Sequence, residues 1–366
     1  MVQKKKEKKT LNVNEGVDPP GAIHPEAIKE LRKHRKSLLE AGDYVKGIRS
    51  GNRTVLSQAI TIIESANPAH QGLAREIISA CLEYAGKSIR IGITGVPGVG
   101  KSSFIESLGT RITASGKRLA VLAIDPSSER SGGSILGDKT RMEDLSTDPN
   151  AFIRPSPSGG SLGGVARKTR ESIILCEACG FDVIFIETVG VGQSETAVHS
   201  MVDFFLLLML AGAGDELQGI KRGIMEMADV IAITKADGNN REKANQAVTE
   251  YKNALHLFPA SESGWTPGVM TCSALEGKGL NEIWGTIQEY IRFTEENGFF
   301  SLNRSRQAKY WMYEFINESI RDRFYTQPSI REHLKSLEAE VLSGSRTSFH
   351  AAMEILDKYG QGESSI

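Results

Sequence analysis

The residues best suited to chemistry form an octet at 95–102, Gly-Val-Pro-Gly-Val-Gly-Lys-Ser, which matches the pattern G-x-x-x-x-G-K-[ST]. An apolar, β-branched run precedes the octet and a helix-like stretch follows it, which is the context that a phosphate-binding loop requires. Backbone N–H groups of such a loop converge on phosphate oxygens, and the helix N-terminus adds partial positive charge. Lys101 can reach the β- and γ-phosphates, and the Ser102 hydroxyl can ligate Mg²⁺. The predicted phosphate-binding residues are Gly95, Val96, Pro97, Gly98, Val99, Gly100, Lys101, Ser102 and Ser103.

A second group of residues selects the base. Thr234-Lys235-Ala236-Asp237 follows an apolar run and resembles the [NT]-K-x-D element of GTPases. The Asp237 carboxylate can accept hydrogen bonds from guanine N1–H and from the exocyclic amine, a donor pair that adenine lacks, while the Lys235 stem flanks the base. Ser273-Ala274-Leu275 fits the element that meets guanine O6 through backbone N–H groups. The sequence therefore predicts GTP and GDP as ligands.

Thr234 stands where many GTPases have Asn. The substitution removes a side-chain amide that braces the loops in those proteins, so we expect a less braced site. The Asp237 contact with guanine is independent of that amide. Guanine selectivity is therefore expected to persist.

Carboxylates at the ends of two predicted strands indicate a metal site. The strand that starts at Asp182 ends in Glu187, where GTPase switches usually have Asp in D-x-x-G, and the strand at 119–124 ends in Asp125. A carboxylate at such a strand end can hold a Mg²⁺-bound water or orient the attacking water. Asp138 lies in the next loop and fits a metal-bound residue or a solvated loop residue equally well. We expect Mg²⁺ to be bound by Ser102 together with Asp125 and Glu187.

These side chains must be positioned by a sheet. Apolar runs predict strands at 89–94, 119–124, 151–154, 182–187, 202–210, 230–234 and 269–273. Helical stretches between them are predicted at 163–179, 216–228, 240–257 and 280–296. Alternation of strands and helices indicates an α/β fold with a mostly parallel sheet flanked by helices, here a P-loop GTPase domain. Ligands of such sheets bind at the carboxyl ends of the strands.

The chain divides into four predicted regions. They are a disordered tail at 1–22, a helical N-terminal extension at 23–87, the P-loop G domain at 88–298 and a C-terminal helical arm at 299–366. Helices are expected in the arm at 304–325, 328–342 and 347–358. The first carries one apolar stripe, made of Ala308, Trp311, Met312, Phe315, Ile316 and Ile320. Because the arm has little apolar surface for its own core, we expect it to dimerise with a second copy; the alternative is that it folds back on its own G domain.

Composition limits the possible partners. The 44 basic and 45 acidic residues give a net charge of −1. The net charge therefore does not favour binding to nucleic acid or to a membrane surface. The longest apolar run, at 204–211, is far shorter than the roughly 18 residues of a membrane span. Four cysteines in 366 residues suggest a reducing compartment. The lysine-rich start lacks the apolar segment of a secretory signal, and we expect a cytoplasmic protein.

Three longer segments carry a resemblance to a known family. Residues 125–142, 187–195 and 212–221 are similar to the first, second and third switches of the methylmalonyl-CoA mutase-associated GTPases. The similarity runs from about residue 40 to residue 330, while residues 1–22 match nothing recognisable. Related sequences also carry the older label of a lysine/arginine/ornithine transport-system kinase. That label makes a nucleotide-dependent kinase linked to amino-acid transport one alternative function.

The resemblance implies a GTP-hydrolysing chaperone of a cobalamin-dependent acyl-CoA mutase, such as methylmalonyl-CoA mutase. Members gate adenosylcobalamin loading, protect and reactivate the mutase, and form homodimers through the helical tail. It implies that Ser102, Asp125 and Asp138 surround Mg²⁺, that Glu187 couples the metal to the second switch, and that Lys221 links the third switch to nucleotide and partner. The catalytic residues are then Lys101, Glu187 and Lys221, and intrinsic turnover is expected to be slow.

Two further patterns need separate interpretations. Gln193 lies three residues beyond Gly190, whereas Ras-like proteins have their water-orienting Gln directly after that glycine, so we assign it no catalytic role. Cys176 and Cys179 form a lone C-x-x-C, and His199 follows the second switch-like segment. A GTPase metallochaperone is therefore the other alternative, although a structural zinc site usually needs four ligands. Packing of both cysteines on the sheet explains them as well.

Overall fold

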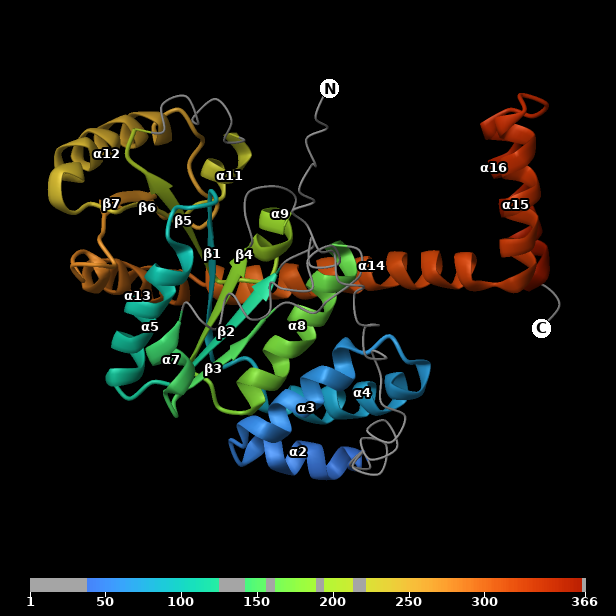
Figure 1. Cartoon of the computed structure of the whole chain (residues 1–366), viewed down its shortest axis with the longest axis horizontal. Coiled ribbons are helices and arrows are strands. Elements are labelled where there is room, and N and C mark those ends of the chain that lie inside the picture. Colours follow the sequence, from blue (N-terminus) through green and yellow to red (C-terminus); the bar gives the residue numbers. More distant parts are fainter. Residues whose placement is uncertain (1–37, 125–141, 156–161, 189–193, 213–221, 364–366) are drawn as a thin grey trace, which may run out of the picture. The chain divides into compact units, whose positions relative to one another are not determined.

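Seven parallel strands form the sheet, in the order β3-β2-β4-β1-β5-β6-β7 (Figure 1). The computed structural model describes residues 38–124, 142–155, 162–188, 194–212 and 222–363. The strands are β1 (Ile89–Gly95), β2 (Leu119–Ile124), β3 (Ala151–Arg154), β4 (Val183–Thr188), β5 (Phe204–Leu210), β6 (Val230–Thr234) and β7 (Gly268–Thr271). All of these strands were expected from the apolar runs, and the predicted α/β fold is confirmed.

The central strands of the sheet are buried on both faces, which is why they are mostly apolar. Every residue of β2, β4 and β6 is buried, and so is all of β5 except its last residue. The central strand β1 pairs with β4 on one side and with β5 on the other; Ile93, for example, lies between Glu187 and Leu206. Because all pairings are parallel, the carboxyl ends of the strands meet at one edge.

Helices cover the two faces of the sheet (Figure 1). They are α5 (Lys101–Ala114), α7 (Glu143–Thr147), α8 (Leu162–Ala178), α9 (Ser194–His199), α11 (Arg222–Glu226), α12 (Arg241–Leu255) and α13 (Leu280–Glu296). α5 packs on β1 and β2 and contacts α13, whereas α8 packs on β2, α9 packs on β1 and β4, and these two helices contact each other. The predicted helices at 163–179, 240–257 and 280–296 correspond closely to α8, α12 and α13.

Among the described residues, three α-helices precede the sheet: α2 (Ala41–Arg49), α3 (Arg53–Glu64) and α4 (Pro68–Cys81). Their starts follow local chemistry: the Asn52 side chain accepts from two backbone N–H groups of α3, and Asn67 caps α4 ahead of Pro68. Ile48, Leu56 and Ile77 belong to the same hydrophobic core as the sheet. The N-terminal helices are therefore part of one compact unit with the strands. The predicted divisions after residues 22, 87 and 298 stay predictions.

The C-terminal region is helical, as expected, with α14 (Phe299–Thr326), α15 (Pro328–Leu342) and α16 (Ser348–Glu363). α14 contacts α8 and α13, while α15 and α16 form a second small hydrophobic cluster around Ile330, Leu337, Ala351 and Ile355. Of the predicted apolar stripe, Trp311 is buried, but Met312, Ile316 and Ile320 are 51%, 42% and 55% exposed. The described residues of the same chain therefore leave most of this stripe uncovered. None of the described helices has the length and apolar character needed to cross a membrane.

Candidate nucleotide-binding site

The phosphate-binding loop connects β1 to α5, and its backbone requires glycine. Gly98 and Gly100 have φ values of +79° and +95°, in the left-handed region. At Gly95 a Cβ atom would lie 2.5 Å from the Leu208 carbonyl oxygen, so any side chain there would collide with β5. The loop thus brings backbone amides and the first turn of α5, with Ser102 and Ser103, to the carboxyl edge of the sheet.

Lys101 is the first residue of α5, and its side chain folds back over the loop. Its Nζ donates to the Gly95 carbonyl at 2.7 Å and approaches the Val96 carbonyl at 3.4 Å. Burial lowers the pKa of Lys101, an effect that the carboxylates of Glu187 and Glu195 oppose. A cation is therefore held inside the loop, next to two buried carboxylates.

Glu187 lies where the sequence predicted, at the carboxyl end of β4. It is 6% exposed and pairs with Ile93 on β1 and with Ala123 on β2. The next residue, Thr188, shares a hydrogen bond with Thr94 through their hydroxyls at 2.8 Å, which ties the ends of β4 and β1 together. Glu187 thus lies between the strand that leads to the phosphate loop and the strand after which Asp125 comes.

Several predicted site residues lie outside the described residues. They are Asp125 and Asp138 in the first switch-like segment, Gln193 in the second and Lys221 in the third. Their roles stay predictions. The described residues fix only the strand ends and helices between which these segments run.

Thr234 braces the phosphate loop, contrary to our expectation that the lost amide would leave the loop less braced. Its hydroxyl donates to the Val99 carbonyl at 2.8 Å and is 3.2 Å from the Met209 carbonyl. Since Thr234 is 5% exposed, these contacts are shielded from water. A hydroxyl on β6 therefore replaces the amide that many GTPases use.

Lys235 adopts the left-handed conformation, with φ of +55°, and is the only non-glycine residue in the described ranges that has positive φ. Its Nζ donates to the Gly98 carbonyl at 2.7 Å, so its stem lies along the phosphate loop. The Asn240 amide donates to the Lys235 carbonyl at 2.8 Å and supports this backbone. Such strained conformations concentrate at ligand sites.

Asp237 is held by Ser273, whose hydroxyl donates to the Asp237 Oδ2 at 2.6 Å. The Glu276 amide donates to the same hydroxyl oxygen, and the Ser273 amide donates to the Lys278 carbonyl, each at about 3 Å. The Ser273 amide is already hydrogen-bonded within its own loop. We therefore expect the predicted contact with guanine O6 from the next two amides, those of Ala274 and Leu275.

Sequence patterns missed three residues that support this site. Asn240 steadies the Lys235 backbone, and the Ser107 hydroxyl of α5 donates to the Ala274 carbonyl at 3.0 Å, joining the phosphate-loop helix to the base-binding loop. Glu195, 1% exposed in the first turn of α9, acts electrostatically on Lys101. Asn and Ser at such places are common loop and helix residues, and Glu195 ends the second switch-like segment without a role that spacing alone would assign.

The cysteines and His199 do not form a metal centre among the residues that the structure describes. Cys176 in α8 and Cys179 just after its end are both buried, and burial raises the pKa of both thiols, which disfavours the thiolate that binds metals. His199 packs edge-on against Phe205 with ring centroids 5.5 Å apart, and burial lowers its pKa. These contacts fit packing residues.

Comparisons with known proteins agree with this geometry. The family described as "Methylmalonyl Co-A mutase-associated GTPase MeaB" matches residues 56–329. The chain is 46% identical over 293 residues to the GTPase ArgK of Escherichia coli, covering 77% of this chain and 88% of that protein. It is 47% identical over 323 residues to the "Methylmalonic aciduria type A homolog, mitochondrial" of Mus musculus, covering 86% of this chain and 78% of that protein.

A solved structure is also similar over the whole of its length. The crystal structure described as an LAO/AO transport system kinase superposes with a TM-score of 0.70 at 34% sequence identity. The superposition covers 88% of this chain and 100% of that chain. The sheet, the phosphate loop and the flanking helices thus have close counterparts in a known protein.

Proposed function

The chain belongs to the family of methylmalonyl-CoA mutase-associated GTPases, and we propose that it is the GTP-dependent chaperone of a cobalamin-dependent acyl-CoA mutase. In this role it gates adenosylcobalamin loading and protects or reactivates the mutase. The observation that carries the proposal is the family match across 56–329, which spans the phosphate loop, the base-binding residues and all three switch-like segments.

The geometry around Asp237 supports guanine as the base. The Ser273 hydroxyl holds one carboxylate oxygen, which fixes the plane in which Asp237 can accept from guanine N1–H and the exocyclic amine. The Lys235 side chain lies along the phosphate loop, where its Nζ donates to the Gly98 carbonyl. A site that is built to pair with two donors discriminates strongly against a base that lacks them.

Mg²⁺ belongs to the proposal as the metal held by Ser102, Asp125, Asp138 and Glu187. The fit rests on the two described members: Ser102 lies in the first turn after the phosphate loop, and Glu187 is a buried carboxylate at the end of the neighbouring strand β4. When bound, the ion neutralises charge on the β- and γ-phosphate oxygens.

The protein's own groups then act by position and charge. Lys101 and the loop amides stabilise the charge that develops on the transferred phosphoryl group, and Glu187 is placed to orient the attacking water. Lys221, in the third switch-like segment, is the third proposed catalytic residue. This chemistry requires no nucleophilic residue. We propose that intrinsic hydrolysis of GTP to GDP and phosphate is slow, since a switch must hold its state long enough to signal.

The exposed apolar residues of α14 support a homodimer formed through the C-terminal helices. All four cysteines are free and buried, which fits a reducing compartment such as the cytoplasm.

Cofactor transfer tests the proposed function. The purified chain is mixed with its cognate apo-mutase and adenosylcobalamin, and cofactor uptake is followed by absorbance with GTP, with GDP and with a non-hydrolysable GTP analogue. We expect uptake to depend on the nucleotide state. Equal uptake with all nucleotides and without the chain would exclude the gating role.

A further inference from the structure

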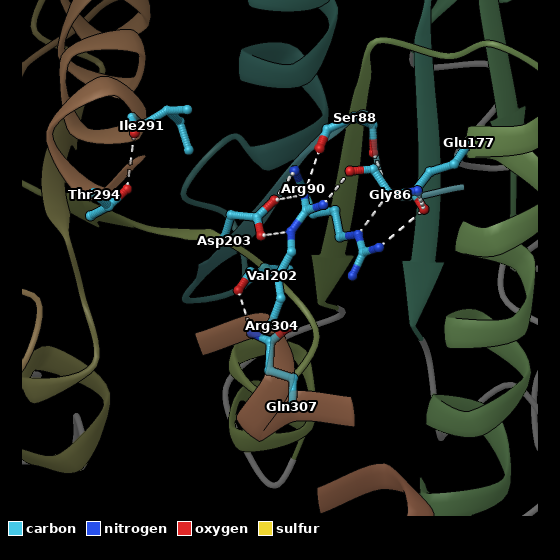
Figure 2. Close-up of polar contacts among 10 residues, drawn as sticks. All are labelled: Gly86, Ser88, Arg90, Glu177, Val202, Asp203, Ile291, Thr294, Arg304 and Gln307. Atoms are coloured by element: carbon cyan, nitrogen blue, oxygen red, sulfur yellow. Dashed lines mark hydrogen bonds and ion pairs between the residues drawn. The ribbon is translucent and has the colours of Figure 1, made fainter. Parts of the chain in front are cut away.

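Three side chains on one face of α14 hold the segment that joins α9 to β5. Arg304, Gln307 and Trp311 have the spacing i, i+3, i+7, which places them on the same side of a helix. The guanidinium of Arg304 binds both carboxylate oxygens of Asp203 at 2.6–2.7 Å. The Gln307 amide donates to the Val202 carbonyl at 2.7 Å (Figure 2), and the Trp311 indole N–H donates to the Ser200 carbonyl at 3.0 Å.

The Arg304 end of this contact is anchored to the sheet (Figure 2). Arg304 also donates to the carbonyls of Gly86 and Ser88, each at 2.6 Å, just before β1. Asp203 in turn accepts from the Arg90 backbone N–H at 2.8 Å. Charge-assisted bonds of this kind are short and directional, so the start of α14 is fixed to the amino ends of β1 and β5.

α9 is enclosed between β1 and this contact. A Cβ atom on Gly92, in the middle of β1, would lie 2.9 Å from the Val198 Cγ1 and 3.2 Å from the Val202 Cγ2. These two valines therefore pack directly on the β1 backbone, on either side of the Ser200 carbonyl that Trp311 binds. α9 also contacts β4, the strand that carries Glu187, and at its other end the buried Glu195 interacts electrostatically with Lys101. One short helix thus reaches from α14 to the surroundings of the phosphate-loop lysine.

We infer that Gln307 and Trp311 are positioning residues for GTP hydrolysis. By holding residues 200–203 they hold α9, and with it the Glu195 carboxylate, in register with Lys101. Both donors are side chains of α14, and the exposed apolar face of the same helix supports the dimer. The packing of the C-terminal helices therefore affects the geometry of the phosphate site. This inference rests on the GTPase activity of the family, and it does not depend on the mutase.

Two chemically identical substitutions separate positioning from general stability. Trp311→Phe removes an indole N–H that binds the Ser200 carbonyl. Trp265→Phe removes the same kind of bond, from Trp265 to the Asp229 carbonyl at 3.1 Å, which does not involve residues 200–203. Gln307→Met removes the second donor of α14 with little change in volume. Single-turnover GTP hydrolysis, GTP affinity and melting temperature are measured for all three variants and the wild type, without mutase.

We expect Trp311→Phe and Gln307→Met to lower the hydrolysis rate about two- to fivefold with unchanged GTP affinity, because each removes one hydrogen bond that holds α9. Trp265→Phe should lower the melting temperature comparably and keep the wild-type rate. The inference is overturned if Trp311→Phe and Gln307→Met hydrolyse GTP at or above the wild-type rate, or if Trp265→Phe slows hydrolysis equally. Wild-type protein that hydrolyses GTP but does not support mutase loading would count against the proposed function alone.

Discussion

At the scale of single residues, the site depends on hydroxyls that orient other groups. Ser273 orients Asp237, and Thr234 braces the phosphate loop through Val99. Motifs identify the residues that touch the ligand, because their chemistry is fixed by the ligand. The residues that orient them, such as Ser107 and Asn240, depend on which loops come together, and spacing along the chain does not reveal that.

Ser273→Ala should weaken GTP binding about fivefold, since Asp237 loses the hydrogen bond that fixes its plane. Asp237→Asn should weaken it by about 100-fold or more, because the amide presents one acceptor where the carboxylate presents two. Isothermal titration with GTP and ATP measures both effects. Wild-type protein that binds ATP as tightly as GTP would contradict the guanine assignment.

Thr234→Val should lower the free energy of unfolding by about 1–3 kcal/mol, since the buried Val99 carbonyl loses its hydroxyl partner. Thr234→Ser keeps the hydroxyl and is the matched control, expected to bind GDP almost as the wild type does. Chemical denaturation and GDP titration give the two readouts. A smaller loss in Thr234→Val than in Thr234→Ser would show that the methyl group, rather than the hydroxyl, matters at this position.

Asp229 predicts a pH dependence of stability. Burial raises its pKa from 3.8 to about 7, although the Phe205 backbone N–H donates to it at 2.8 Å. Between these values the folded state binds a proton that the unfolded state does not, so the free energy of unfolding falls as the pH rises from 5 to 8. Denaturation across this range should show a decrease on the order of a few kcal/mol that is absent in Asp229→Asn.

His199 has the opposite effect on the pH dependence of the free energy of unfolding. Burial lowers its pKa, so its protonation favours unfolding at acidic pH. The difference between wild type and Asp229→Asn cancels this effect. A variant with the same pH profile as the wild type would rule out Asp229 as the titrating group.

At the scale of elements, the strands and most helices follow from the sequence. Apolar runs such as Phe204–Leu210 have few alternatives to a buried parallel strand, and Pro328 marks the start of α15 as predicted. What spacing could not reveal is long-range pairing: Arg304 and Asp203 are 101 residues apart, and their contact fixes how α14 sits on the sheet.

Gly92→Ala tests the close packing of α9 on β1. The new Cβ would lie 2.8 Å from Phe205 and 2.9 Å from Val198, so the variant should lose about 1–3 kcal/mol of unfolding free energy. Gly72→Ala in α4, where a Cβ has open space, should instead gain about 0.5–1 kcal/mol. Chemical denaturation compares the two, and a neutral Gly92→Ala would mean that α9 can shift away from β1.

At the scale of the whole molecule, the uncovered apolar face of α14 predicts a dimer. Ile316→Glu places a charge on this face, where the residue is 42% exposed, and should shift the protein to monomer. Asn317→Glu adds the same charge at the next exposed position and is the control. Sedimentation velocity measures both variants. A dimer that survives Ile316→Glu, or that is lost equally in Asn317→Glu, contradicts an interface built on this stripe.

We propose that the protein as a whole is a nucleotide switch whose hydrolysis serves as a signal to a mutase. The most direct test measures the GTP hydrolysis rate of the full chain with and without its purified cognate adenosylcobalamin-dependent mutase. We predict slow hydrolysis of GTP by the chain alone and faster hydrolysis with the mutase. A rate that the mutase leaves unchanged would contradict it.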